Sequence, residues 1–399
     1  MRISTYWSQQ QAVNQMLDNQ SQLAVTQQQI SSGSKLLSPA DDPAGAARAL
    51  DLHSYDTAIQ QYTRNISTAT SRLGIEDSAL SLATTLLQSA RTLALEGLNG
   101  SQSDASRQAI ATQLDQQIAQ LQQIANTQDA NGEYLFAGNA TRTQPFTQAA
   151  NGSIVYAGDQ GQRQVALAPG QTVATGDPGS AVFMQVPTGN GSFAVNAAST
   201  NTGTGVVGST AVSDPTLWSP AGYSIQFTAP GTYQVLDATS AVIASGSYSD
   251  GGSISFKGIS ITLNGTPAAG DTFAVAPSGT QSVFASLQSI AAALATPADT
   301  ATQRAAAGNQ INASLQNVDQ ALQRLSETRA KVGARVNMLT QQQTANGNID
   351  VQVKATLSGI QDVDYASAVS QLNMQMTALQ AAQQVYVKVQ GLSLFNYIR

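Results

Sequence analysis

The sequence predicts an α+β fold: helices from both ends of the chain form a long antiparallel coiled coil, and an all-β domain is inserted between them. Two stretches of the 399-residue chain, 1–145 and 280–399, are rich in Ala, Gln and Leu, and their apolar residues recur at helical spacing. Residues 146–279 hold 20 of the 32 glycines and only eight charged residues. Short alternating apolar runs bounded by Gly, Pro, Asn and Asp are typical of β-strands.

The helical part is predicted to pack along two apolar stripes, here called the rod seam. Apolar residues at three-four spacing line one helix face, which favours side-by-side helix packing. Each stripe has a single polar interruption, Glu76 in the first and Arg329 in the second. The rod seam consists of Leu52, Ile59, Ile66, Leu73, Glu76, Leu80 and Leu87 in the first half of the chain, and of Ile311, Leu315, Val318, Leu322, Leu325, Arg329, Val332, Val336 and Leu339 in the second.

Two interpretations of these interruptions stay open. Because the two stripes should run antiparallel, Glu76 and Arg329 can form an ion pair across the helices that fixes their register. Alternatively, each side chain extends along the apolar surface and places its charge in water.

Both ends of the chain are predicted to be assembly segments, disordered in the monomer and ordered by contacts with neighbouring copies. Glutamines at 10, 20 and 27 interrupt the apolar face of residues 3–31, so burial there offsets little of the entropy lost on ordering. The predicted assembly residues are Ile3, Val13, Met16, Leu17, Leu23 and Ile30 near the N-terminus, and Tyr365, Val369, Leu372, Met376, Leu379, Leu394, Phe395 and Ile398 near the C-terminus.

These patterns divide the chain into five expected segments. They are an N-terminal assembly segment 1–40, an N-terminal helical part 41–145, a β-rich insertion 146–279, a C-terminal helical part 280–345 and a C-terminal assembly helix 346–399. Asp41 or Asp42 is expected to cap the helix that starts near Pro43. A polar stretch, 341–348, is expected to break the C-terminal helix, and residues 134–136 and 181–186 are expected to be strands.

Composition argues against several classes of function. The chain has no Cys and a single His, His53, so neither thiolate chemistry nor a metal site is expected. No nucleophile motif or phosphate-binding loop is present, so we expect no enzyme and no cofactor. The net charge is −6 with no basic stripe, which argues against nucleic acid. No stretch approaches the roughly 20 apolar residues that span a bilayer, and the first residues lack the apolar core of a cleaved signal peptide.

Several stretches resemble the flagellin family, and within it the proteins that join the hook to the filament. They are residues 1–5 (MRIST), 29–36 (QISSGSKL), 38–50 (SPADDPAGAARAL), 131–138 (NGEYLFAG), 333–337 (GARVN) and the end 392–399 (LSLFNYIR). Residues 258–273 (GISITLNGTPAAGDTF) are similar to a strand pair common in hook-associated proteins. The resemblance covers 1–145 and 280–399 nearly throughout.

What the resemblance implies is a structural protein at the hook–filament junction, on which flagellin polymerises. Its terminal helices would form the inner coiled coil of a ring or tube of identical copies, and the β insertion would face outward. Hook-associated protein 1, flagellin and a flagellar export chaperone would be its partners. The protein would be extracellular, exported by the flagellar type III system without a cleaved signal. Two alternatives remain: flagellin itself, or an extracellular binding module carried by the β insertion.

Overall fold

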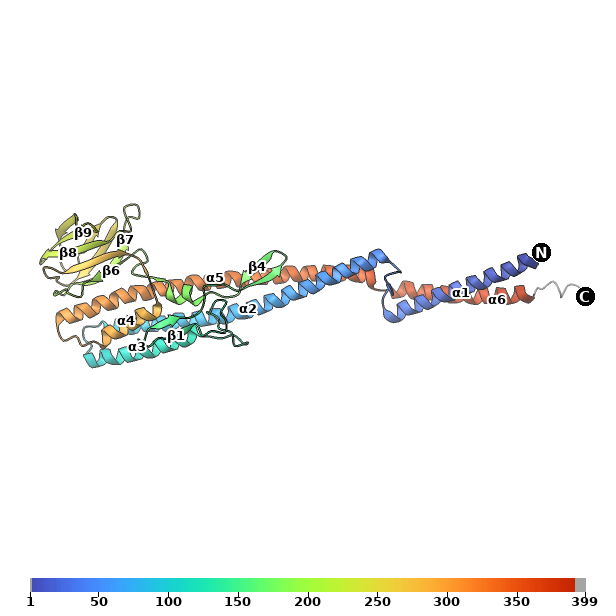
Figure 1. Ribbon diagram of the computed structural model, residues 1–399, viewed down its shortest axis with the longest axis horizontal. Helices are drawn as coiled ribbons and strands as arrows, with labels where there is room; N and C mark the ends of the chain where they lie inside the picture. Colours follow the sequence, from blue (N-terminus) through green and yellow to red (C-terminus); the bar gives the residue numbers. More distant parts are fainter. Residues whose placement is uncertain (1, 392–399) are drawn as a thin grey trace, which may run out of the picture. The chain divides into compact units, whose positions relative to one another are not determined.

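The computed structural model describes residues 2–391, which form two compact units (Figure 1). The first contains residues up to 64 and from 342 on, and the second contains residues 65–341. Two long helices, α2 (Pro43–Gly97) and α5 (Ala301–Gln361), each contribute residues to both units. Helices α1 (Arg2–Ser32) and α6 (Tyr365–Gly391) belong to the first unit, and α3 (Asp104–Ala125) and α4 (Val283–Ala295) to the second. The predicted helical regions at both ends of the chain are therefore confirmed.

In the second unit, α2 and α5 pack antiparallel, as the sequence predicts. Arg91 Nε lies 2.6 Å from Asp319 Oδ1, and Arg329 Nε lies 2.9 Å from Asp77 Oδ1. The later residue of α2 thus contacts the earlier residue of α5, as in an antiparallel pair. Most rod seam residues are buried: Ile59, Ile66, Leu73, Glu76, Leu80, Leu87, Ile311, Leu315, Val318, Leu325, Val332 and Leu339. Leu52, Leu322, Arg329 and Val336 are half-buried.

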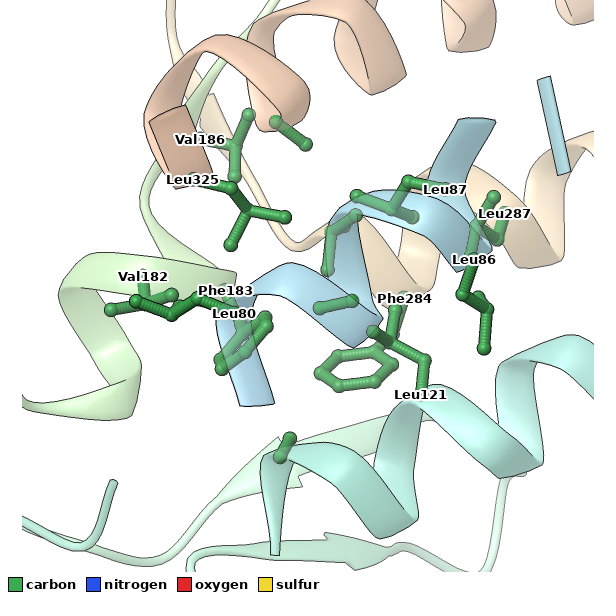
Figure 2. Close-up of a cluster of buried hydrophobic side chains, with 14 of the residues drawn as sticks. Leu80, Leu86, Leu87, Leu121, Val182, Phe183, Val186, Phe284, Leu287 and Leu325 are labelled. Atoms are coloured by element: carbon green, nitrogen blue, oxygen red, sulfur yellow. The ribbon is translucent and has the colours of Figure 1, made fainter. Parts of the chain in front are cut away.

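The core of the second unit also draws on α3, α4 and the first part of the β-rich block. Figure 2 shows Leu80, Leu87 and Leu325 converging with Phe183 and Phe284. The Phe183 ring meets that of Phe136 edge-on, with centroids 5.3 Å apart. The elements added here are β1 (Phe146–Gln148), β2 (Ile154–Tyr156), β3 (Gln164–Ala168), β4 (Gln171–Ala174), a π-helical turn (Ser180–Met184), β5 (Val186–Pro187) and β14 (Thr280–Gln281).

The β-rich residues between 193 and 277, here called the β domain, have a core of their own. Five antiparallel strands form one sheet in the order β10-β9-β8-β13-β6, and three form another in the order β11-β12-β7. Alternate residues face the core, for example Ile259, Ile261 and Leu263 on β12. The strands are β6 (Phe193–Ala197), β7 (Val206–Val212), β8 (Tyr223–Ala229), β9 (Thr232–Asp237), β10 (Val242–Ser247), β11 (Ser253–Phe256), β12 (Ile259–Asn264) and β13 (Thr272–Pro277).

Amide side chains on one face of α5 fix the β domain to the helix. The Nδ2 group of Asn309 donates to the Gly205 carbonyl, and its Oδ1 accepts from the Val207 N–H, both at 2.8 Å. Asn312 Nδ2 donates to the Val207 carbonyl at 2.9 Å. Asn309 and Asn312 are three residues apart and therefore lie on the same face of α5. Their amides bond the free edge of β7, where another strand could otherwise pair.

Three local predictions are wrong. Residues 134–136 form no strand, because Phe136 turns into the aromatic core. Residues 180–184 form a π-helical turn, which buries the adjacent Val182 and Phe183 together, whereas a strand would point them to opposite faces. The expected break over 341–348 is absent, since α5 continues to Gln361 and buries Asn346, which accepts from Gln342 Nε2.

The Glu76–Arg329 pair is also wrong, because Arg329 contacts Asp77 instead. Glu76 does not reach water either: it is fully buried, and its Oε1 accepts from the Asp177 N–H at 3.0 Å. The Asp177 carboxylate in turn accepts two hydrogen bonds, at 2.8 and 2.9 Å, from the guanidinium of Arg335. These contacts join α2 and α5 to the chain that follows β4.

Glu76 is held in its neutral form. Its burial, together with the nearby Asp177 carboxylate, raises the pKa of Glu76 to about 8. Its Oε2 has no hydrogen-bond partner among the described residues, which suits a carboxylic acid better than a carboxylate.

We expect Asn309→Ala to loosen the β domain from α5. The substitution leaves the buried Val207 N–H and the Gly205 carbonyl unpaired, so the free energy of unfolding should fall by about 1–3 kcal/mol. Amide exchange at Val207 should accelerate. The control is Gln323→Ala, an exposed position on α5 whose side chain donates to Glu327, where a change within about 0.5 kcal/mol is expected. Unchanged exchange along β7 in the Asn309 variant would contradict this account.

We expect Glu76→Gln to remove a pH dependence of stability. Between the ordinary pKa of 4.5 and the raised pKa of about 8, the unfolded chain has lost the Glu76 proton while the folded chain keeps it. The stability of the unsubstituted protein therefore falls as the pH rises through this window.

The Gln variant should accordingly be more stable by up to about 4 kcal/mol near pH 7.5, and this gain should shrink as the pH falls towards 4.5. Urea unfolding at several pH values measures the difference. The matched control is Glu327→Gln, at an exposed position on α5. Parallel pH profiles for the unsubstituted and Glu76→Gln proteins would show that Glu76 is not neutral in the folded chain.

Candidate assembly surface

Helices α1 and α6 contact each other along their length and are here called the terminal pair (Figure 1). Six of the predicted assembly residues are half-buried there: Val13, Met16, Leu23, Ile30, Leu372 and Leu379. They lie at three-four or seven-residue spacing, so each helix presents one stripe to the other. These six side chains, which the sequence analysis assigned to contacts with neighbouring copies, therefore lie on the faces that α1 and α6 of one chain present to each other.

The terminal pair buries very little. Among the described side chains of α1, those of residues 6–7 and 9–32, only that of Thr26 is buried, and it is polar. Its Oγ1 donates to the Gln22 carbonyl within the same helix. Among residues 365–389 of α6, only Ala368 is buried. A helix owes most of its stability in a protein to a buried apolar face, and this pair has almost none.

Large apolar side chains remain exposed on both helices of the terminal pair. Leu17 is 58% exposed, Met374 64% and Val387 67%. Of the predicted assembly residues, Leu17, Tyr365, Val369 and Met376 belong to this exposed set. The side chain of Ile3 and residues Leu394, Phe395 and Ile398 lie outside what the structure describes. The sequence analysis did not select Tyr6, Trp7, Val25, Met374, Val385, Val387 and Val389, which are exposed as well.

The terminal pair also carries almost no charge. Arg2 and Asp18 are the charged residues of α1, and Lys388 is that of α6. The remaining polar side chains are mostly Gln, Asn, Ser and Thr. Large apolar side chains that lie exposed among neutral polar ones, with so few charges nearby, are typical of a surface that contacts another molecule. This signal was available in the sequence at residues 385–389, where Val alternates with Tyr and Lys.

A short backbone connection joins the terminal pair to the neighbouring parts of α2 and α5 in the first unit. The Lys35 N–H donates to the Gln361 carbonyl at 2.6 Å, and the Val363 N–H donates to the Gly33 carbonyl at 3.0 Å. Gly33 has φ +72°, a left-handed conformation that glycine adopts without strain. The two chain segments that leave α1 and α5 are thus paired before α2 and α6 begin.

The two predicted capping residues have separate roles. Asp42 caps α2, because its Oδ1 accepts from the Gly45 N–H at 2.9 Å. Asp41 instead closes the preceding loop by accepting from the Ser38 and Leu37 N–H groups. The Ser38 hydrogen bond is the main cause that lowers the pKa of Asp41.

Beyond this connection, α2 and α5 share a small core in the first unit. It consists of Ala49, Ile59, Val353 and Leu357, with Leu52 packed against it. The ion pair of Lys354 with Asp350 lies on the same stretch of α5, at 2.8 Å. His53 Nε2 lies 3.1 Å from Gln361 Oε1, an ordinary polar contact.

Neither a metal site nor a membrane span is found in the part of the chain that the structure describes. Within residues 2–391, no three His, Cys, Asp or Glu side chains are placed to hold a metal ion. None of the helices in this range combines the length and apolar character needed to cross a bilayer.

Comparison with known proteins identifies both ends and the middle of the chain. The bacterial flagellin N-terminal helical region matches residues 3–141, and the bacterial flagellin C-terminal helical region matches residues 315–398. The D2-like domain of flagellar hook-associated protein 1 matches residues 196–277, which lie within the β domain.

One curated relative covers nearly the whole chain, and two solved structures cover about three quarters of it. Flagellar hook-associated protein 3 of Escherichia coli K12 is 26% identical over 397 residues, 99% of either chain. The crystal structure of Xanthomonas campestris FlgL is 36% identical, with a TM-score of 0.72, and covers 76% of this chain and 98% of its own. The flagellar junction protein FlgL of Legionella pneumophila is 31% identical, with a TM-score of 0.68, over 72% of this chain and 98% of its own. The chain therefore belongs to the flagellar hook-associated protein 3 (FlgL) family, a family of structural proteins of the flagellum rather than enzymes.

Proposed function

We propose that this chain forms the junction between hook and filament as an assembly of identical copies, held together by the terminal pair. The observation that carries the proposal is that α1 and α6 expose far more apolar side chains than they bury. Hardly any of their described side chains are buried, yet eleven large apolar ones are exposed. Exposed apolar surface of this extent is typical of interaction sites.

The small buried apolar surface of α1 and α6 also supports the proposal that these helices become ordered only on assembly. In a single copy, the terminal pair has too little buried apolar surface to offset the entropy of ordering the 31 residues of α1 and the 27 residues of α6 at roughly 1–2 kcal/mol each. Neighbouring copies supply the missing contacts by covering Leu17, Met374 and Val387. Of the expected assembly segments 1–40 and 346–399, the parts that form α1 and α6 therefore act in assembly, whereas residues 346–361 belong to α5 and pack against α2. The assembled form is the one in which α1 and α6 are stable.

The junction has a different neighbour at each end. We infer hook-associated protein 1 on the hook side and flagellin on the filament side, with an export chaperone on the C-terminal helix beforehand. A β domain of a type also found in hook-associated protein 1 supports the first of these. The location that follows is extracellular, after type III export without cleavage of a signal.

The β domain offers little to the alternative of a ligand-binding module. Three of its carboxylates are used within its own loops. Asp214 and Asp237 accept from Thr216 and Thr239, and these hydrogen bonds lower the pKa of both carboxyls. Asp271 is buried and accepts from the Thr202 and Gly203 N–H groups. These groups hold the loops of the β domain together.

Hydrogen exchange tests the dependence of order on assembly. In the monomer, amides of residues 9–30 and 365–389 should exchange at least about a hundredfold faster than those of α2 between residues 66 and 94, since weakly packed elements open at little cost. In assembled material both segments should become protected. Equal protection of α1 and the core of α2 in the monomer would contradict the proposal.

Substitution of exposed apolar residues tests the assembly surface. The triple variant Leu17→Ser, Met374→Ser, Val387→Ser should lose about 5 kcal/mol or more of intersubunit stabilisation per copy, at 1.5–3 kcal/mol for each apolar side chain. In a bacterium deleted for its own copy, cells expressing the variant should have hooks without filaments and release flagellin into the medium. Electron microscopy and immunoblots of the medium measure both.

The control for this experiment is Leu217→Ser, at a position 60% exposed in the β domain. It should restore filaments as the unsubstituted protein does. The triple variant must itself be detected in the medium, which separates failed assembly from failed export. Normal filaments on cells that express the triple variant would overturn the proposed surface.

A further inference from the structure

The chain contains six Asn-Gly pairs, and this dipeptide can modify itself. The backbone nitrogen of the glycine attacks Cγ of the asparagine side chain and forms a five-membered succinimide. The bond from Cγ to Nδ2 breaks, and ammonia leaves with the proton of the attacking nitrogen. Water then opens the ring at either carbonyl and yields aspartate or isoaspartate. The pairs are 99–100, 131–132, 151–152, 190–191, 264–265 and 346–347.

Four of the six glycine nitrogens donate a loop hydrogen bond that must break before they can attack. Gly132 donates to the Asp129 carbonyl at 3.0 Å, Gly152 to the Ala149 carbonyl at 2.9 Å and Gly191 to the Thr188 carbonyl at 3.3 Å. Gly265 donates to the carboxylate of Asp250.

The fifth pair is protected by the helix that contains it. Asn346 and Gly347 lie inside α5, and the Asn346 side chain is only 3% exposed. Its Oδ1 accepts from Gln342 Nε2 at 2.8 Å. Ring closure here requires local unfolding of the helix, which costs far more than a change of rotamer.

The pair Asn99-Gly100 differs from the others. It lies exposed in the turn between α2 and α3, and among the described residues no group accepts from the Gly100 N–H. A Cβ atom built on Gly100 would meet nothing within 4 Å, so the turn has room to move. Asn99 Oδ1 accepts from the Ser101 N–H at 3.1 Å and from its hydroxyl at 2.9 Å. Both bonds withdraw electron density from Cγ and make it a better electrophile. Asn151 Oδ1 accepts the same two bonds from Ser153, at 3.1 and 2.7 Å, so the glycine nitrogen is what distinguishes the two pairs.

We propose that Asn99 is a site of spontaneous deamidation in the folded protein, selected from six identical dipeptides by its free glycine nitrogen. The product carries a new carboxylate in the turn just before α3, whose N-terminus tolerates negative charge. The isoaspartate product also adds one atom to the main chain of the turn.

The test follows all six pairs in the purified full-length protein. The protein is incubated at mildly alkaline pH, and peptide mass mapping with isoaspartate labelling gives the rate at each pair. Asn99 should react at least about fivefold faster than each of the other five, the factor that corresponds to one hydrogen bond of about 1 kcal/mol. In denaturant this difference should disappear. Asn151 and Asn264 are internal controls, because the residues on either side of their Asn-Gly pairs are the same as, or similar to, those that flank Asn99-Gly100.

Two variants complete the test. Gly100→Ala keeps an ordinary backbone conformation and open space but hinders the attacking nitrogen, so it should abolish the fast reaction at Asn99. Gly347→Ala, in the middle of α5, should leave the rate at Asn99 unchanged. The proposal is overturned if another pair reacts as fast as Asn99 in the folded protein, or if Gly100→Ala leaves the rate at Asn99 as it was.

Discussion

The apolar face shared by α2 and α5 organises the larger unit, because every other part of that unit is attached to one of these two helices. The core of this unit contains Ile66 and Leu73 of α2 and Val332 and Leu339 of α5. Phe183 and Phe284 pack into the same core. Buried area of this kind stabilises a fold without specifying direction. The register of α2 against α5 is marked by the ion pairs at its margins, Arg91 with Asp319 and Arg329 with Asp77.

Two kinds of helix pair therefore occur in one chain. The α2–α5 pair buries large apolar side chains almost without interruption, whereas the terminal pair buries Thr26 and Ala368 among its described side chains. The first pair folds on its own contacts. The second leaves large apolar side chains exposed, which is the basis of the proposed assembly surface.

Helical periodicity allowed the fold class and the buried apolar stripes of α2 and α5 to be predicted. Of the exposed residues on α6, Met374, Val385 and Val387 were not selected, because they lie off the stripe that periodicity detects. Asn309 and Asn312 were missed for another reason: an amide on a helix has no special meaning until a strand edge is placed beside it. The partners of Glu76 and Arg329 depended on the register of two long helices and on a loop a hundred residues away, neither of which is encoded locally.

The low charge of the terminal pair has a consequence for the environments in which a junction built from it can work. Contacts between ions weaken as dissolved salt screens them over distances of about 10 Å or less. The side chains of Leu17, Val25, Met374 and Val387 carry no charge, so contacts between them are not weakened by this screening. A joint held by these side chains keeps its strength whether the surrounding water is fresh or saline.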